Sequence, residues 1–171
     1  LTGAYNRRYL LPQTRRHFAD YHRYARLSSL LLLDIDDFKR INDEMGHVEG
    51  DRVLKAIVAL IDSRIRGADM LFRLGGEEFV VLLSEVGAQT ARKIADDLRS
   101  KIAAQEVITD RRVTVSIGIC DVSIVDSAED WLLRVDRAMY EAKRKGRDQV
   151  YIEEPSPRDP TNVEGTIPMW R

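Results

Sequence analysis

Two apolar runs in residues 71–83 are separated by Gly75-Gly76-Glu77-Glu78, and this stretch restricts the chain to folds that contain a β-hairpin. The flanking residues include the aromatic and branched side chains typical of strands, and a Gly-Gly pair accepts the positive φ angles of a tight turn. The turn also carries two adjacent carboxylates beside glycine backbone that a ligand can approach closely. On this stretch alone, a solvated hairpin tip and a ligand site explain the pattern equally well.

A second acidic cluster follows a run of four leucines. Residues 30–33 predict a central strand buried on both faces, and Asp34-Ile35-Asp36-Asp37 comes directly after it. If this strand is a sheet neighbour of the hairpin, Asp34 lies close to Glu77. Carboxylates, carbonyls and substrate phosphates together bind hard divalent cations such as Mg²⁺, as phosphoryl transfer requires. The alternative is that the acids at 34–37 cap the helix that follows.

Two stretches of the sequence carry groups that suit phosphate. The amides of Asp37 and Phe38 would open a helix, where backbone N–H groups bind anions, and Lys39 adds a cation. Residues 143–147, Lys-Arg-Lys-Gly-Arg, end a later predicted helix. The alternative for this second group is a solvated helix end whose charges complement the helix dipole.

The remaining periodicities predict one layered domain. Helices are expected at residues 6–26, 38–46, 51–65, 87–104 and 130–145. Strands are expected at residues 28–33, 69–74, 78–84, 113–120 and 150–152. Asp51 would cap the start of its helix, and residues 153–171, which hold four of the five prolines, predict a linker or disordered tail.

Composition narrows the classes of function. A net charge of −1 gives no basic field for nucleic acid, so we expect no nucleic-acid partner. The single cysteine, Cys120, excludes an intramolecular disulfide and a Cys-rich zinc cluster. No apolar run is long enough to span a bilayer. The chain begins at Leu1 without an initiator methionine, which suggests a fragment of a longer protein.

Five motifs, in the same order and with matching spacing, resemble the GGDEF family of diguanylate cyclases over residues 1–152. The family signature occurs as Arg-Leu-Gly-Gly-Glu-Glu-Phe at residues 73–79, in the variant with glutamate at its third place. The other motifs lie at residues 1–8, 34–51, 115–119 and 136–147. The resemblance implies a domain of the α/β (α+β) class, with a central, mostly antiparallel five-stranded sheet flanked by helices.

The resemblance also implies a reaction and its partners. Two GTP molecules, one on each of two domains, would condense to cyclic di-GMP with release of pyrophosphate, which makes a homodimer the expected active unit. Mg²⁺ would be the cofactor, with Mn²⁺ as an alternative. The expected location is the cytoplasm, with a region upstream of Leu1 that would supply dimerisation and, in the full-length protein, any membrane anchor.

By position in the family's motifs, the resemblance assigns a role to each site residue. The expected metal-binding groups are Asp34, the Ile35 carbonyl, Glu77 and, in support, Glu78. Glu77 would also be the base for the ribose 3′ hydroxyl. The expected nucleoside contacts are Asn42, Asp51 and His47. The expected phosphate contacts are Lys39, Lys143, Arg147 and the amides of Asp37 and Phe38, with Gly75 and Gly76 lining the substrate site. Because guanine carries N1 and N2 protons that adenine lacks, the Asp51 carboxylate would favour GTP over ATP.

Arg66-Gly67-Ala68-Asp69 lies at the position of the family's RxxD inhibitory site, where the product cyclic di-GMP would bind Arg66 and Asp69. The alternative is a helix-to-strand turn with a surface ion pair. In relatives a further arginine often joins this site. That position is Asp97 here, so Arg92 or Arg99 would have to substitute.

The resemblance leaves alternatives for the function. The leading hypothesis is an active diguanylate cyclase, because the metal, base, guanine and phosphate positions are all filled. The first rival is a catalytically inactive module that binds GTP or cyclic di-GMP as a regulatory sensor. The second, a cyclase that also uses ATP, is disfavoured by Asp51.

Overall fold

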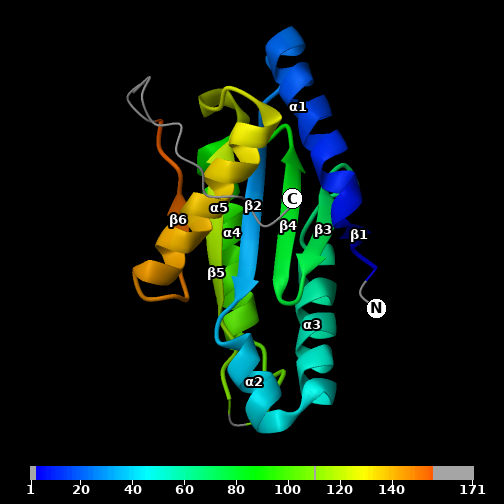
Figure 1. Cartoon of the computed structure of the whole chain (residues 1–171), viewed down its shortest axis with the longest axis vertical. Coiled ribbons are helices and arrows are strands. Elements are labelled where there is room, and N and C mark those ends of the chain that lie inside the picture. Colours follow the sequence, from blue (N-terminus) through cyan, green and yellow to red (C-terminus); the bar gives the residue numbers. More distant parts are fainter. Residues whose placement is uncertain (1–2, 110, 156–171) are drawn as a thin grey trace.

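The computed structural model describes residues 3–109 and 111–155 of the 171-residue chain. Its centre is a six-stranded sheet in the order β1-β3-β4-β2-β5-β6 (Figure 1). The strands are β1 (Tyr5–Asn6), β2 (Ser28–Ile35), β3 (Met70–Gly75), β4 (Glu78–Ser84), β5 (Val115–Asp121) and β6 (Val150–Ile152). The three inner pairings are antiparallel, whereas β1 and β6 pair in parallel with β3 and β5. The predicted fold class is therefore confirmed, with one strand more than expected.

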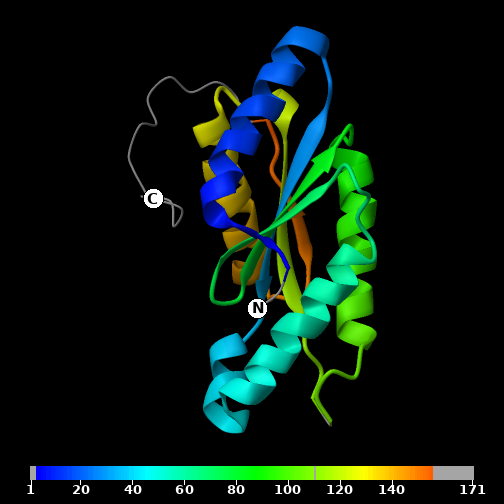
Figure 2. The same ribbon diagram turned by 90° about the vertical axis from the view of Figure 1, so that its right-hand side faces the viewer.

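Helices cover both faces of the sheet. They are α1 (Leu10–Tyr24), α2 (Phe38–Met45), α3 (His47–Asp62), α4 (Ala88–Ala104) and α5 (Ala128–Arg144), with short 3₁₀ turns η1 (Arg7–Tyr9) and η2 (Val122–Ile124). Figure 2 shows α1 and α5 on one side of the sheet and α3 and α4 on the other. The architecture is thus a helix–sheet–helix sandwich.

The leucine run forms the central strand, as predicted. Every residue of β2 is buried, because the strand lies between β4 and β5 and has helices over both faces. Leu31 and Leu33 belong to the core under α3 and α4, while Leu30 and Leu32 belong to the core under α1 and α5. Successive side chains of a strand point to opposite faces, so a continuous apolar run is what two cores require.

The first helix begins later than predicted because two residues before it form β1. Tyr5 and Asn6 pair with Phe72 and Arg73 of β3, and the Asn6 side chain accepts a hydrogen bond from the Arg8 amide at the start of η1. A two-residue strand has no periodicity, so the sequence pattern did not separate it from the helix.

The predicted capping role of Asp51 is wrong. Helix α3 begins at His47, four residues earlier than expected, and Gly46 separates it from α2 with a positive φ of 85°. Asp51 therefore lies in the second turn of α3 with its side chain exposed. Gly46 both ends α2 and precedes α3, so no loop lies between these two helices in which a carboxylate could cap the start of α3.

Gly118 sets the distance between β5 and α5. A Cβ atom at this position would lie 2.1 Å from the Met139 backbone nitrogen, so only glycine permits this close packing. The contact holds the body of α5 against the sheet. As a result, the C-terminal end of α5 lies beside the end of β2.

Glu153, the first residue of the predicted tail, is hydrogen-bonded to the sheet and to α5. The Glu153 amide donates to the Ile119 carbonyl (2.7 Å), and its buried side chain accepts hydrogen bonds from Arg137. Residues 156–171 lie outside the described residues, so the tail remains a prediction. Within residues 3–109 and 111–155, no helix has both the length and the apolar character needed to cross a bilayer.

Candidate functional site

The hairpin between β3 and β4 has the predicted tight turn, but only one glycine uses its conformational freedom. Gly76 has a φ of 46°, whereas Gly75 is the last residue of β3 and does not have a positive φ. The Arg73 guanidinium donates from Nε (3.2 Å) and Nη2 (2.7 Å) to the Gly76 carbonyl. A Cβ atom at Gly75 or Gly76 would meet nothing within 4 Å, so the outside of the turn is open.

The two acidic clusters meet at one end of the sheet, as the sequence predicted. Asp34 is opposite Glu78 in the antiparallel register of β2 and β4, and the Ile35 amide donates to the Glu77 carbonyl (3.3 Å). Asp34 is 4% exposed, while Glu77 and Glu78 are partly buried. The carboxylates of Asp34, Glu77 and Glu78 therefore share one edge of the core, which we call the acidic edge.

The charge of Asp34 is only partly compensated. Lys143 Nζ, from the end of α5, lies 2.8 Å from Asp34 Oδ1, yet this buried oxygen has no hydrogen bond of regular geometry from the residues described. Burial raises the pKa of Asp34 to about 6, against the opposing effect of Lys143. Burial, and then the negative charge of Asp34, raises the pKa of Glu78 to about 7. Removing carboxylates from water disfavours their charged forms, so this edge favours an added cation.

This donor set suits a hard divalent cation. Carboxylate and carbonyl oxygens are the preferred ligands of such ions, which also take ligands from water and phosphate. No group of three or more His, Cys, Asp or Glu side chains in the described part of the chain is arranged to enclose a metal ion. An ion bound by Asp34 and the glutamates would therefore need backbone, solvent or substrate oxygens to complete its ligands.

The acids after β2 do not cap α2 through Asp37. Asp37 occupies the cap position with a left-handed φ of 54°, but its exposed side chain makes no capping hydrogen bond. Instead, Arg147 Nε lies 3.6 Å from Asp37 Oδ1. The side chain at the start of α2 thus faces the loop after α5, and the capping alternative is wrong for this residue.

The expected phosphate contacts gather around this junction. Lys143 reaches Asp34, and Arg147 reaches Asp37, so the end of α5 and the start of α2 are neighbours. Lys39 is exposed in the first turn of α2. The cations at 143–147 are therefore not merely solvated, since two of them face the acidic edge.

The expected guanine contacts lie on α2 and α3. A Cβ atom at Gly50 would lie 2.0 Å from Asn42 Oδ1 and 3.2 Å from Phe38 Cζ, so this glycine allows α3 to pack directly on α2. Asp51 is the next residue along α3, and both Asp51 and His47 are exposed. The sequence prediction gave Gly50 no role, although a glycine inside a helix signals close packing.

Asp36 is a further residue to which the sequence prediction gave no role. It is buried and accepts hydrogen bonds from the hydroxyls of Thr114 and Ser116 and from the Asp148 amide. These partners are distant in sequence, so no local pattern identifies them.

The RxxD motif forms a turn between α3 and β3. Asp69 Oδ2 accepts from the Arg66 amide (2.8 Å), and Asp69 Oδ1 accepts from the Ser84 amide (3.0 Å). The alternative of a turn is therefore correct in part, although the Asp69 bonds are to backbone and not to a guanidinium. Of the two candidate substitutes, Arg92 pairs with Asp96 and Arg99 pairs with Asp148.

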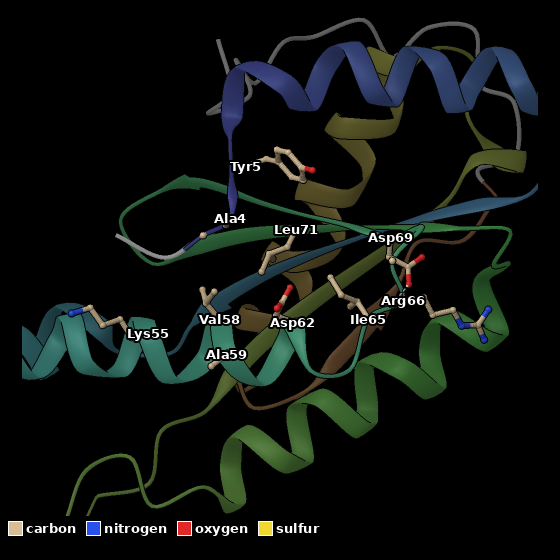
Figure 3. Close-up of a pocket in the computed structure, with 12 residues that line it drawn as sticks. Ala4, Tyr5, Lys55, Val58, Ala59, Asp62, Ile65, Arg66, Asp69 and Leu71 are labelled. Carbon is tan, nitrogen blue, oxygen red and sulfur yellow. Dashed lines mark hydrogen bonds between the residues drawn. The ribbon is translucent and has the colours of Figure 1, made fainter.

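A groove of about 510 Å³ lies beside this turn. Figure 3 shows Arg66 and Asp69 at one end of it, Lys55 at the other, and Tyr5 on the opposite wall from α3. The motif, with Arg66 exposed and Asp69 partly buried, thus borders a concave surface separate from the acidic edge.

Comparisons with known proteins identify the family of this chain. The family described as "Diguanylate cyclase, GGDEF domain" matches residues 1–149. The chain is 40% identical over 158 residues to diguanylate cyclase DgcP of Pseudomonas aeruginosa, and 40% identical over 150 residues to diguanylate cyclase DgcM of Escherichia coli (strain K12). These matches cover 89% and 88% of this chain, but only 23% and 37% of the two relatives.

Solved structures share the fold. The active GGEEF domain of a diguanylate cyclase from Vibrio cholerae is similar at a TM-score of 0.84 and 33% identity, over 89% of this chain and 99% of that one. The coiled coil and GGDEF domain of DgcB from Caulobacter crescentus, in complex with c-di-GMP, is similar at a TM-score of 0.82 and 25% identity, over 88% and 82%. The chain therefore belongs to the GGDEF domain family of diguanylate cyclases.

Proposed function

We propose that this chain is an active diguanylate cyclase domain that condenses two GTP molecules to cyclic di-GMP and pyrophosphate. The observation that carries the proposal is the buried Asp34 carboxylate, which faces Glu78 across the sheet and has one oxygen without a regular hydrogen bond. Relatives named diguanylate cyclase support it, as does the V. cholerae domain described as active with the same GGEEF signature.

In the reaction, the ribose 3′ oxygen of each GTP attacks the α-phosphorus of the other. The bond from that phosphorus to the bridging oxygen of pyrophosphate breaks, and pyrophosphate takes the electron pair. Glu77 would accept the hydroxyl proton, because it lies in the open turn where substrate can approach. Asp34, the Ile35 carbonyl, Glu77 and Glu78 would hold Mg²⁺ or Mn²⁺, which when bound offsets negative charge on the phosphates.

The remaining groups would bind and orient GTP. Asn42 and Asp51 would read the guanine edge, with His47 near the nucleoside. The phosphate contacts would be Lys39, Lys143, Arg147 and the amides of Asp37 and Phe38. Lys143 supports this assignment because it is drawn to the acidic edge by Asp34 and is one-third exposed, so it can exchange that partner for a phosphate.

The proposal also covers the active assembly, the inhibition by product and the extent of the domain. Each domain would hold one GTP, so a homodimer would be the active unit, and cyclic di-GMP would inhibit by binding Arg66 and Asp69. The c-di-GMP complex of C. crescentus DgcB supports product binding. Residues 1–152 would form the domain, residues 153–171 a tail, and the domain would act in the cytoplasm.

The test is incubation of the purified chain with GTP and Mg²⁺, at a protein concentration that allows dimers, with nucleotides separated by chromatography. We expect cyclic di-GMP and pyrophosphate from the wild type and none from Glu77→Ala. Glu85 is an exposed acid directly after the other end of β4, so Glu85→Ala is the matched control and should keep full activity. Calorimetric binding of GTP or cyclic di-GMP without pyrophosphate release would instead identify a regulatory module.

A further inference from the structure

Asp36 joins three segments at the acidic edge. Its Oδ2 accepts hydrogen bonds from Thr114 Oγ1 (2.8 Å) and from the Asp148 amide (3.0 Å), and its Oδ1 accepts from Ser116 Oγ (2.6 Å). The side chain is 6% exposed. It thereby links the end of β2 to the start of β5 and to the loop between α5 and β6.

The loop held by Asp36 carries Arg147 in an unusual conformation. Arg147 and Asp148 have consecutive positive φ values of 63° and 43°, a conformation that residues other than glycine rarely adopt. Such strain persists only where surrounding contacts over-determine it. The Asp36 bond to the Asp148 amide is one of these contacts. Arg99 and Arg112 also pair with the Asp148 carboxylate at 2.7 Å and 3.1 Å, and the Arg147 amide donates to the Ala142 carbonyl (3.2 Å).

We propose that Asp36 is a positioning residue that holds Arg147 in place for the triphosphate of the substrate. The inference rests on the proposed function, because it takes Arg147 as a phosphate contact. Asp36 itself cannot reach the substrate, since its two oxygens are buried and occupied. Losing it frees the Asp148 amide, and the strained loop then relaxes and withdraws Arg147.

Two substitutions of Asp36 distinguish its role in positioning the loop from the effect of its negative charge. Asp36→Ala removes every acceptor. Asp36→Asn keeps one carbonyl oxygen for the Asp148 amide but replaces the other oxygen with an amide NH2 group and removes the charge. The Ser116 hydroxyl can rotate to accept from the new amide group, so Asn should preserve the loop. An electrostatic effect of Asp36 on Asp34 would make the two variants equally defective.

The measurement is the affinity of the full chain for two ligands in the presence of Mg²⁺. One is a GTP analogue with a methylene group between the α- and β-phosphorus, and the other is guanosine. Asp36→Ala should weaken binding of the analogue about 10-fold, the value of one charge-assisted contact, and leave guanosine within about 2-fold. Asp36→Asn should stay within about 3-fold of wild type for both ligands.

A double-mutant comparison identifies Arg147 as the intermediary. If Asp36 acts through Arg147, Asp36→Ala combined with Arg147→Ala should bind the analogue no more weakly than Arg147→Ala alone. Additive losses would overturn the proposal. So would an Asp36→Asn variant as weak as Asp36→Ala, or equal weakening of analogue and guanosine.

Asp121 supplies the matched control, because it is a second buried aspartate that accepts backbone amides, at the opposite end of β5. Asp121→Ala should lower stability and leave both affinities unchanged. If Asp36→Ala does not fold, Thr114→Val with Ser116→Ala removes the hydroxyls that hold the carboxylate, and the analogue affinity should fall about 3-fold or more. Unchanged analogue affinity in this double variant would overturn the proposal.

The outcomes for Asp36 and for the proposed function are distinct. If the wild type binds no analogue, both the proposed function and the role of Asp36 are wrong. If Arg147→Ala weakens binding as proposed while Asp36→Ala matches the wild type, only the role of Asp36 is wrong.

Discussion

The two ends of the central sheet both bury an aspartate, but they satisfy its carboxylate differently. Asp121, opposite Ser29 in the sheet, accepts from the Ala88 amide (2.9 Å) and the Ser123 amide (2.7 Å). Asp34, at the other end of β2, has one buried oxygen without a regular hydrogen bond and shares its edge with two glutamates. A satisfied carboxylate stabilises the fold, whereas a poorly satisfied one costs stability and is available to a ligand.

The strongest test of this contrast is Glu77→Gln at the acidic edge. If Glu77 is the base, the amide cannot accept the ribose proton, and turnover should fall by about 100-fold or more. Steady-state pyrophosphate release measures turnover, and thermal unfolding should show a midpoint close to that of the wild type. Glu78→Gln should cost less, because Glu78 only supports the metal site. Full activity in Glu77→Gln would falsify the assignment of the base, even though the family assignment would stand.

At the opposite end, Asp121→Ala should act on stability alone. The substitution leaves the Ala88 and Ser123 amides without their acceptor and should lower the free energy of unfolding by about 1–3 kcal/mol. Urea denaturation measures this change, and cyclase activity per folded molecule should be unaltered. Asp126→Ala, at an exposed aspartate near the same end, is the control and should change stability by about 0.5 kcal/mol or less. A loss of turnover in folded Asp121→Ala would mean that the two ends do not act separately.

The sequence predicted the acidic edge because its signals are local. The run at residues 30–33 predicted a strand buried on both faces, and the Gly-Gly turn predicted a hairpin, and the structure contains both. Once β2 and β4 are neighbours, the antiparallel register places Asp34 opposite Glu78. The sequence pattern marked residues 143–147 only as a cationic helix end. The contact of Lys143 with Asp34 depends on the position of α5, which close packing at Gly118 sets.

What the sequence did not predict depends on contacts between distant segments. Asp36 was grouped with its acidic neighbours, but its bonds to Thr114, Ser116 and Asp148 become visible only when β5 and the last loop are in place. Asp51 was expected at a helix start because the apolar periodicity was assigned to residues 51–65. The actual helix begins at once after Gly46, which tertiary packing of α3 on α2 permits.

The third test concerns the stability cost of the unsatisfied carboxylate. Burial raises the pKa of Asp34 from 3.8 to about 6, so the folded protein binds this proton more tightly than the unfolded chain does. Between these values the position contributes less stability as pH rises, and the cost is complete above the folded pKa. In metal-free buffer at pH 7.5, Asp34→Asn should therefore stabilise the fold by roughly 1–3 kcal/mol.

The pH dependence distinguishes this cause from a general effect of the amide. The advantage of Asp34→Asn should shrink as pH falls through about 6, because the wild-type carboxyl then takes up its proton. Urea denaturation of both proteins at several pH values measures the difference. An advantage that is constant from pH 4 to pH 8 would contradict the burial of charge as its source.

The smallest expected effect on the fold is at the RxxD turn, which combines features of both ends. Asp69 is satisfied like Asp121, since both of its oxygens accept backbone amides, yet it borders an open groove. Arg66 contributes its backbone amide to this turn, so Arg66→Ala keeps the hydrogen bond and should change stability by about 0.5 kcal/mol or less. If the guanidinium binds cyclic di-GMP, the variant should lose about 1.5–3 kcal/mol of product affinity, which is about 10- to 150-fold in the inhibition constant. Initial rates at increasing cyclic di-GMP measure this constant, with Arg64→Ala, two residues earlier and also exposed, as the matched control. Equal inhibition of Arg66→Ala and wild type would show that the motif is only a turn, in which Asp69 accepts backbone amides as Asp121 does.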